Sequence, residues 1–163
     1  MVARRILTVP GDEKKLRKKS KKIDNIDSII RRTLDEMLQM IDSIGYGLAA
    51  PQIGILKRIT VIQYKDKVFK LINPRIIKKS DDTVCDIEGC LSVPGLIGDV
   101  DRNFAVTVKA QDQTGKIVKI EAEGLLARIF QHEIDHLDGI LYTDKAQNLR
   151  EPRTVEEGED AEI

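Results

Sequence analysis

The chain has 163 residues, of which 41% are hydrophobic and 33% are charged, and its formal net charge is zero. This length and composition are typical of one globular domain with its own core, and they give no sign of a DNA-binding protein. The sequence also lacks an apolar run long enough for a membrane helix and the hydrophobic region of a signal peptide, so we expect no membrane association.

The N-terminal part of the chain is polar and its charge is uneven. Residues 6–10 are predicted to form a short strand or an extended arm, and residues 14–22 are strongly basic, whereas residues 156–162 are acidic. Both charged runs are typical of a solvated surface or a free tail. The alternative for the basic run is contact with a polyanion such as ribosomal RNA.

An amphipathic helix is predicted to begin at Asp24 or Asp27, either of which can cap it, and to end near residue 41. Its apolar stripe consists of Ile26, Ile29, Ile30, Leu34, Met37, Leu38 and Ile41. The spacing of this stripe indicates a structural helix that packs on the core.

Residues 45–54 form a small, apolar segment that is punctuated by glycines and contains Gln52 as its only amide. Glycine lets a backbone approach a ligand closely, and Pro51 stiffens the turn that presents Gln52. The segment therefore favours a binding role. The alternative is a buried connector in which Gln52 satisfies nearby backbone groups.

Two pairs of predicted strands follow this connector. Residues 58–64 and 67–72 are predicted to be strands, and we expect Pro74 to end the second. Residues 104–110 and 116–122 are predicted to form a hairpin.

The two cysteines lie between these pairs of strands. Residues 83–87 are β-prone and lead to Cys90, which follows a glycine in a predicted loop before Pro94. That position suits a thiolate held out from a sheet edge, whereas Cys85 is predicted to be a small core residue. Two cysteines in a chain without secretory features favour the reducing cytoplasm over a disulfide.

Residues 131–137 contain His-Glu-x-x-His, and His132 and His136 are the only histidines in the chain. Positions i and i+4 share one face of a helix, so both histidines can bind one metal ion. Glu133 between them can take a proton from a metal-bound water. The alternative is a charged helix whose histidines lie four apart by chance. A metal site would also need a third ligand.

Three segments, residues 45–54, 88–92 and 131–137, resemble in this order the three signature motifs of the peptide deformylases. Strands before and after two helices, without regular β-α-β alternation, predict an α+β fold. The resemblance adds antiparallel β-sheets packed around a central helix that carries the His-Glu-x-x-His motif. We expect a catalytic domain over residues 1–146 and an acidic, disordered tail over residues 147–163.

The resemblance implies a metal-dependent hydrolase. Cys90 would be the third ligand beside His132 and His136, with water in the fourth position, which is a catalytic rather than a closed structural arrangement. The family resemblance implies Fe(II) in the cell. Zinc, nickel or cobalt can also occupy such a site, since thiolate and imidazole suit several ions.

The implied reaction removes the formyl group from the N-terminal formylmethionine of newly made polypeptides. A metal-bound hydroxide would attack the formyl carbon, with Glu133 as the general base and acid. By the same resemblance, the Gln52 side-chain amide and the backbone N–H of Leu91 would stabilise the negative oxygen of the tetrahedral intermediate.

The resemblance also suggests how a formylated nascent peptide would bind. Ile44, Gly45 and Gly89 are predicted to pair with its backbone, as in an added strand. Leu125 and Ile129 are predicted to line an apolar pocket for the methionine side chain. A transient ribosome contact is a further expectation. Ile97 stands where many family members carry an arginine, which affects the expected affinity or substrate preference.

Two other functions were weighed against this one. Zinc endopeptidases also use His-Glu-x-x-His, but they usually take a third ligand from a downstream Glu or His, and this chain has no third histidine. A metal-stabilised module without catalysis, associated with the ribosome through the basic run, would not need Glu133 or Gln52. The sequence therefore favours the deformylase prediction.

Overall fold

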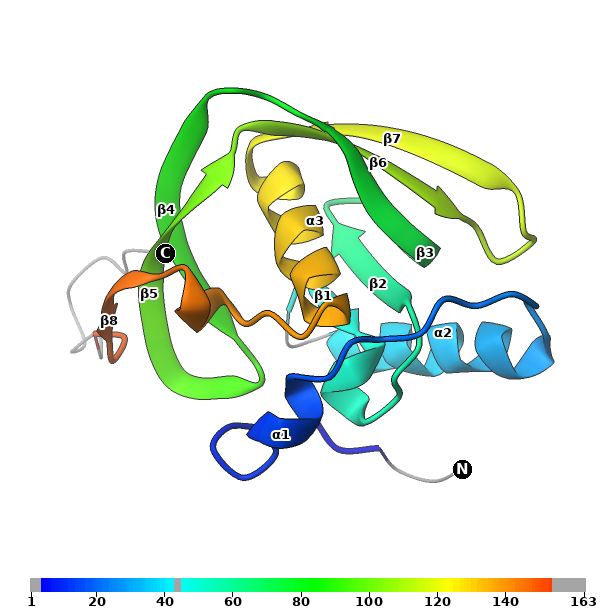
Figure 1. Cartoon of the computed structure of the whole chain (residues 1–163), viewed down its shortest axis with the longest axis horizontal. Coiled ribbons are helices and arrows are strands. Elements are labelled where there is room, and N and C mark those ends of the chain that lie inside the picture. The colour runs from blue at the N-terminus through cyan, green and yellow to red at the C-terminus, as the bar shows by residue number, and fades with distance from the viewer. Residues whose placement is uncertain (1–3, 43–44, 154–163) are drawn as a thin grey trace.

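Two antiparallel sheets surround one helix in this computed structural model, which describes residues 4–42 and 45–153 (Figure 1). The larger sheet has the order β1-β2-β3-β6-β7 and the smaller has the order β4-β5-β8. The strands are β1 (Gly47–Ala49), β2 (Ile59–Tyr64), β3 (Lys67–Lys79), β4 (Thr83–Cys90), β5 (Val93–Asn103), β6 (Ala105–Gln111), β7 (Ile117–Glu123) and β8 (Gln147–Arg150). The predicted α+β class with antiparallel sheets is confirmed.

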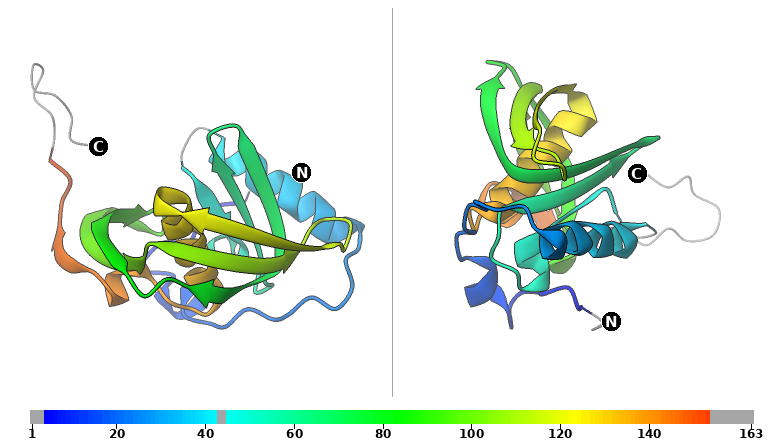
Figure 2. Two further views of the ribbon diagram at one scale, coloured as in Figure 1. Left: turned by 90° about the horizontal axis from the view of Figure 1, so that it is seen from above. Right: turned by 90° about the vertical axis from the view of Figure 1, so that its right-hand side faces the viewer.

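Helix α3 (Gly124–Leu137) carries the His-Glu-x-x-His residues and lies near the middle of the molecule (Figures 1 and 2). Strands β6 and β7 cross over one side of it, and β4 and β5 flank it on another. Its buried face, which includes Phe130 and Ile134, packs with Val106 and Val108 of β6 in one apolar cluster. This packing fixes the helix, so it holds the side chains of its other face in place.

Helix α2 (Ser28–Ile41) covers β1 and β2 through a second apolar cluster that includes Leu34, Met37 and Val61. The Asp27 side chain caps the helix by accepting a hydrogen bond from the Ile30 N–H at 2.9 Å, which confirms one of the two predicted caps. The predicted stripe is wrong at Ile29, which is 64% exposed. Ile29 precedes the buried Ile30 by one residue, so it projects about 100° around the helix from the core face.

The N-terminal residues form an extended arm rather than a strand, followed by the short helix α1 (Glu13–Leu16). The arm connects two of the motifs, because Leu7 N–H donates to the Gln52 carbonyl at 2.7 Å and Val9 N–H donates to the Ser92 carbonyl at 2.9 Å. The chain segment before the basic run therefore helps to hold the motif loops together.

Three predictions about the strands are wrong. Pro74 does not end the second strand, because β3 continues to Lys79 through irregularities in its pairing with β6 that accommodate the proline. Cys85 is exposed on β4, an edge strand of the smaller sheet, rather than buried. Residues 147–150, expected to be disordered, form β8 because they pair with β5 at Ile97 and Asp99. Residues 154–163 of the expected tail lie outside the described residues.

None of the helices in the described part of the chain has the length and apolar character needed to cross a membrane.

Candidate active site

Helix α3 and the end of β4 bring the three predicted metal ligands together. The Cys90 Sγ atom and one ring nitrogen each of His132 and His136 all lie within 4.8 Å of one another, and Sγ is 3.3 Å from His136 Nε2. A tetrahedral zinc-like ion with ordinary bond lengths would hold sulfur and nitrogen about 3.6 Å apart. The ligand spacing therefore fits one small divalent ion.

The electrostatics of these ligands also suit a cation. Burial lowers the pKa of His132, but hydrogen bonds to Cys90 and Glu88 outweigh it and raise the pKa to about 10, so positive charge is favoured there. Burial holds the pKa of His136 well below its ordinary value, which keeps this imidazole in the neutral form that binds metal. The residues present fit a divalent metal.

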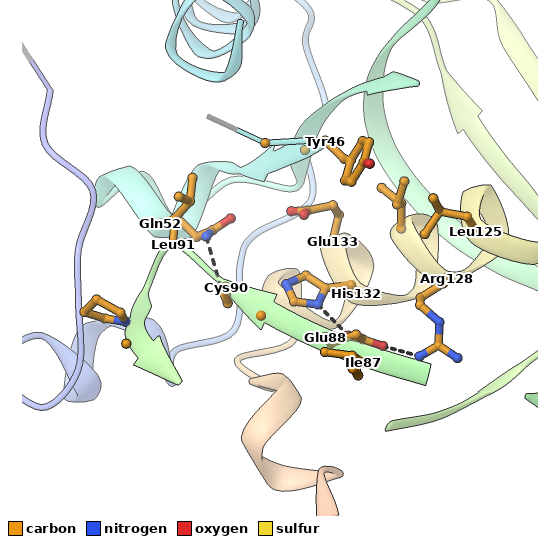
Figure 3. Close-up of a pocket in the computed structure, with 16 residues that line it drawn as sticks. Tyr46, Gln52, Ile87, Glu88, Cys90, Leu91, Leu125, Arg128, His132 and Glu133 are labelled. Carbon is orange, nitrogen blue, oxygen red and sulfur yellow. Dashed lines mark hydrogen bonds and ion pairs between the residues drawn. The ribbon is translucent and has the colours of Figure 1, made fainter. Parts of the chain in front are cut away.

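Glu88, which is buried next to the ligands, fixes the orientation of His132. Its Oε1 atom lies 2.7 Å from His132 Nδ1, which leaves Nε2 free to face the ligand cluster (Figure 3). Arg102 donates two hydrogen bonds of 2.9 Å to this carboxylate, and Arg128 donates another of 2.7 Å. Burial raises the pKa of Glu88, but the hydrogen bonds from Arg102 and His132 outweigh it, so the carboxylate stays ionised.

Glu133 follows His132 on α3 and its side chain reaches toward β1. The residue is 5% exposed, and its Oε2 atom has no hydrogen-bond partner among the described residues. Burial is the main cause that raises its pKa to about 7. A buried carboxyl group with an unbonded oxygen and a pKa near neutrality can both accept and return a proton.

Gln52 lies in the 3₁₀ helix η1 (Ala50–Ile53), directly after β1. Its Oε1 atom accepts a hydrogen bond from the Ala49 N–H at 2.9 Å, which fixes the orientation of the amide. Its Nε2 atom therefore points at Cys90 Sγ, 3.6 Å away, and at Ser92 Oγ, 3.2 Å away. The buried-connector alternative is thus incomplete, because only the amide oxygen of Gln52 bonds to the backbone, whereas its N–H donors face Cys90 and Ser92.

A pocket of about 580 Å³ opens over these groups and contains most of the predicted substrate residues. It is lined by Gly45, Tyr46, Gly47, Gln52, Ile87, Glu88, Gly89, Cys90, Leu91, Pro94, Gly95, Leu125, Arg128, Ile129, His132 and Glu133. Ile44, predicted to bind the substrate backbone, lies outside the described residues.

Several lining residues were not predicted to have a role, among them Tyr46, Gly47, Glu88 and Arg128. Tyr46 and Gly47 lie within the first motif and Glu88 begins the second, so their positions in the motifs were a signal that sequence reasoning could have used. Arg128 lies four residues before His132 on α3, a spacing that places both side chains on the same face of the helix.

Comparisons with known proteins agree with this geometry. Residues 3–152 match the family model described as polypeptide deformylase. The chain belongs to the peptide deformylase family. A peptide deformylase of Symbiobacterium thermophilum is 54% identical over 91% of this chain and 70% of its own length.

Solved structures of peptide deformylases share the fold. The Thermotoga maritima enzyme has a TM-score of 0.84 and 36% identity, covering 90% of this chain and 99% of that one. The Synechococcus elongatus enzyme, solved in complex with actinonin, has a TM-score of 0.83 and 40% identity, covering 89% of this chain and 79% of that one.

The activity of the chain is therefore that of a peptide deformylase, a hydrolase that removes the formyl group from nascent polypeptides. Peptide deformylases use a divalent metal ion, and the Cys90, His132 and His136 cluster supplies a set of donors for one. Family membership favours this prediction over the endopeptidase and the binding-only module.

Proposed function

We propose that Cys90, His132 and His136 hold one divalent ion, Fe(II) in the cell, and that deformylation takes place beside it. The observation that carries this proposal is the approach of three ligand atoms to within 4.8 Å of one another, next to a buried carboxyl group with a free oxygen. When bound, the ion acts as a Lewis acid that lowers the pKa of a water molecule and polarises the formyl carbonyl group.

Glu133 moves the proton. Its carboxylate accepts a proton from the attacking water and returns it to the departing amine nitrogen of the peptide, so the carboxyl group ends the cycle as it began. The raised pKa of the Glu133 carboxyl group suits both steps, because a carboxylate with a much lower pKa accepts a proton poorly.

The Gln52 amide and the Leu91 backbone N–H stabilise the oxyanion that forms on the formyl oxygen. Gln52 supports this role because the Ala49 N–H holds its amide with Nε2 directed at the ligand cluster. Leu91 lies in the turn between β4 and β5 and lines the same pocket. Fixed donors of this kind need little reorganisation when charge develops.

The peptide binds as an extended strand in the pocket, next to Gly45 and Gly89. Strand β1 is at the edge of the larger sheet, so one side of the backbone in this region is available for pairing. The methionine side chain occupies the apolar part of the pocket at Leu125 and Ile129. Leu125 is 41% exposed, so a large apolar side chain can gain buried area there.

The test is deformylation of formyl-Met-Ala-Ser by anaerobically purified protein, with metal content measured on the same sample. We expect turnover proportional to bound Fe(II). Exposure to air should inactivate this form, because oxygen oxidises the iron or the Cys90 thiolate, and replacement of the iron by zinc should protect the activity.

Each result of this test is informative. Full activity of a verified iron form after long aerobic storage would contradict the assignment of iron. A protein that binds no divalent metal would exclude the Cys90, His132 and His136 site, and a metal-loaded protein without turnover would exclude the proposed chemistry. Cys85→Ser is the matched control, since this exposed thiol lies outside the pocket and its loss should change none of these results.

We further propose a cytoplasmic enzyme that makes transient contact with ribosomal RNA through the face around the basic run. This lysine face consists of Lys14, Lys15, Lys18, Lys19, Lys21, Lys22 and Lys57, all of which are exposed. Lys57 joins the others because residues 21 and 57 pair in a short parallel bridge. Clustered cations of this kind favour binding to the phosphate backbone of a nucleic acid.

Replacement of Lys18, Lys19 and Lys21 by glutamate reverses their charge. It should weaken binding to purified ribosomes by at least about tenfold and reduce the salt dependence of binding. The control makes the same charge change at Lys78, Lys79 and Lys119, which are exposed on the larger sheet. Equal losses in the two variants would show that net charge alone matters and would contradict a defined lysine face.

A further inference from the structure

At Gly47 in β1, the backbone conformation would allow a side chain, but the surrounding atoms leave no space for one. The backbone of Gly47 is outside the left-handed region, so its conformation does not require glycine. A Cβ atom built at this position would lie 2.9 Å from both Cγ and Oε1 of Glu133 and 3.0 Å from its Cδ. These distances are well inside ordinary van der Waals contact.

The three nearest atoms all belong to the end of the Glu133 side chain. Backbone atoms cannot move without disturbing the fold, but the end of a glutamate can rotate at small cost. Gly47 pairs with Ile62 of β2, and the next residue, Leu48, is fully buried, so β1 itself has little freedom to shift. A side chain at position 47 would therefore move the Glu133 carboxyl group and leave the strand in place.

We propose that Gly47 is a positioning residue: its missing side chain creates the space that holds the Glu133 carboxyl group beside the metal ligands. This inference rests on the proposed role of Glu133 in proton transfer. It assigns to Gly47 a function in catalysis that does not depend on backbone flexibility.

The test is a double-mutant cycle with Gly47→Ala and Glu133→Ala, assayed on formyl-Met-Ala-Ser. Gly47→Ala should lower kcat by about 100-fold, the size of effect expected when a catalytic group is displaced by about 1 Å. KM, bound metal and Tm should change little. In the Glu133→Ala background, where the crowded atoms are gone, Gly47→Ala should change kcat by less than about twofold.

The control for the loss of a glycine is Gly11→Ala, because a Cβ atom at this position outside the pocket would meet nothing within 4 Å. It should leave kcat unchanged. If Glu133→Ala alone keeps near-normal kcat, the proposed role of Glu133 fails.

If Glu133→Ala is inactive but Gly47→Ala retains kcat, the inference about Gly47 fails. It fails equally if Gly47→Ala changes KM instead of kcat, lowers the remaining kcat of the Glu133→Ala variant, or prevents folding. Each of these results would show that the added methyl group acts on something other than the Glu133 carboxyl group.

Discussion

Replacement of Glu133 by alanine is expected to reduce kcat by about 10²–10⁴-fold, the range attributed to a positioned general acid and base. The bound metal should remain, because the three ligand atoms belong to Cys90, His132 and His136. Folding should not suffer either. Glu133 is 5% exposed and its Oε2 atom lacks a partner among the described residues, so burial of the carboxyl group costs stability and its removal should leave Tm unchanged or higher.

The measurements are steady-state kinetics on formyl-Met-Ala-Ser, metal content and thermal unfolding of the same preparation. Glu121→Ala is the matched control, because it removes an exposed carboxylate from β7 at a position outside the pocket. A Glu133→Ala variant with near-normal kcat would show that another group moves the proton. Loss of metal in this variant would instead make Glu133 part of the binding site.

The parts of the fold that followed from the sequence are those with a strong local signal. The helix that begins after Asp27 has a capping side chain and an apolar stripe, and the hairpin of β6 and β7 has alternating β-branched residues, so both were predicted nearly to their ends. The histidines of the candidate metal site were predictable for a related reason. His132 and His136 are one helical turn apart, so local geometry alone places them together.

The errors arose where distant parts of the chain decide the structure. Pro74 ends many strands, but here the neighbouring strand β6 accommodates it through irregular pairing, and no local pattern reveals that partner. Cys85 lies between Val84 and Asp86, a pattern that does not decide which face of a sheet it occupies. Its exposure depends on β4 being an edge strand, which is a property of the topology.

The same limit applies to the site. The third candidate ligand, Cys90, is separated from the histidines by the whole β5–β7 region, so only the family resemblance connected them. Gly47 was visible as part of a glycine-rich motif, but its proximity to Glu133 is a tertiary contact between β1 and α3. Sequence reasoning named the candidate groups for the chemistry. It did not find the residues that hold those groups in position.

Glu88 is the clearest case of such a residue, and its replacement by glutamine is expected to affect both stability and metal binding. The Glu88 carboxylate compensates the buried guanidinium groups of Arg102 and Arg128, whose side chains are 3% and 8% exposed. Glutamine would keep the shape and remove the charge. Breaking a buried ion pair by removing one partner costs about 3–5 kcal/mol, so we expect a loss of this size in the free energy of unfolding.

The effect on metal binding has a separate cause. Glu88 accepts a hydrogen bond from His132 Nδ1 and so fixes the direction of Nε2. Loss of such a partner typically weakens metal affinity by about 10–100-fold, and we expect Glu88→Gln to do so in a competition assay with a chelator. If Glu88 had a purely structural role, Glu88→Gln would lower stability. It would not change the metal affinity of the folded protein or the visible spectrum of its cobalt form.

The variant Asp135→Asn distinguishes the role of Glu88 in stability from its role in orienting His132. Asp135 also pairs with Arg102, at 2.6 Å, but it is less deeply buried than Glu88 and pairs with Lys145 as well. We expect Asp135→Asn to lower the free energy of unfolding by less than Glu88→Gln and to leave metal affinity intact, because the hydrogen bond between Glu88 and His132 remains. Equal losses of affinity in both variants would mean that the whole charged cluster, rather than Glu88 alone, orients His132.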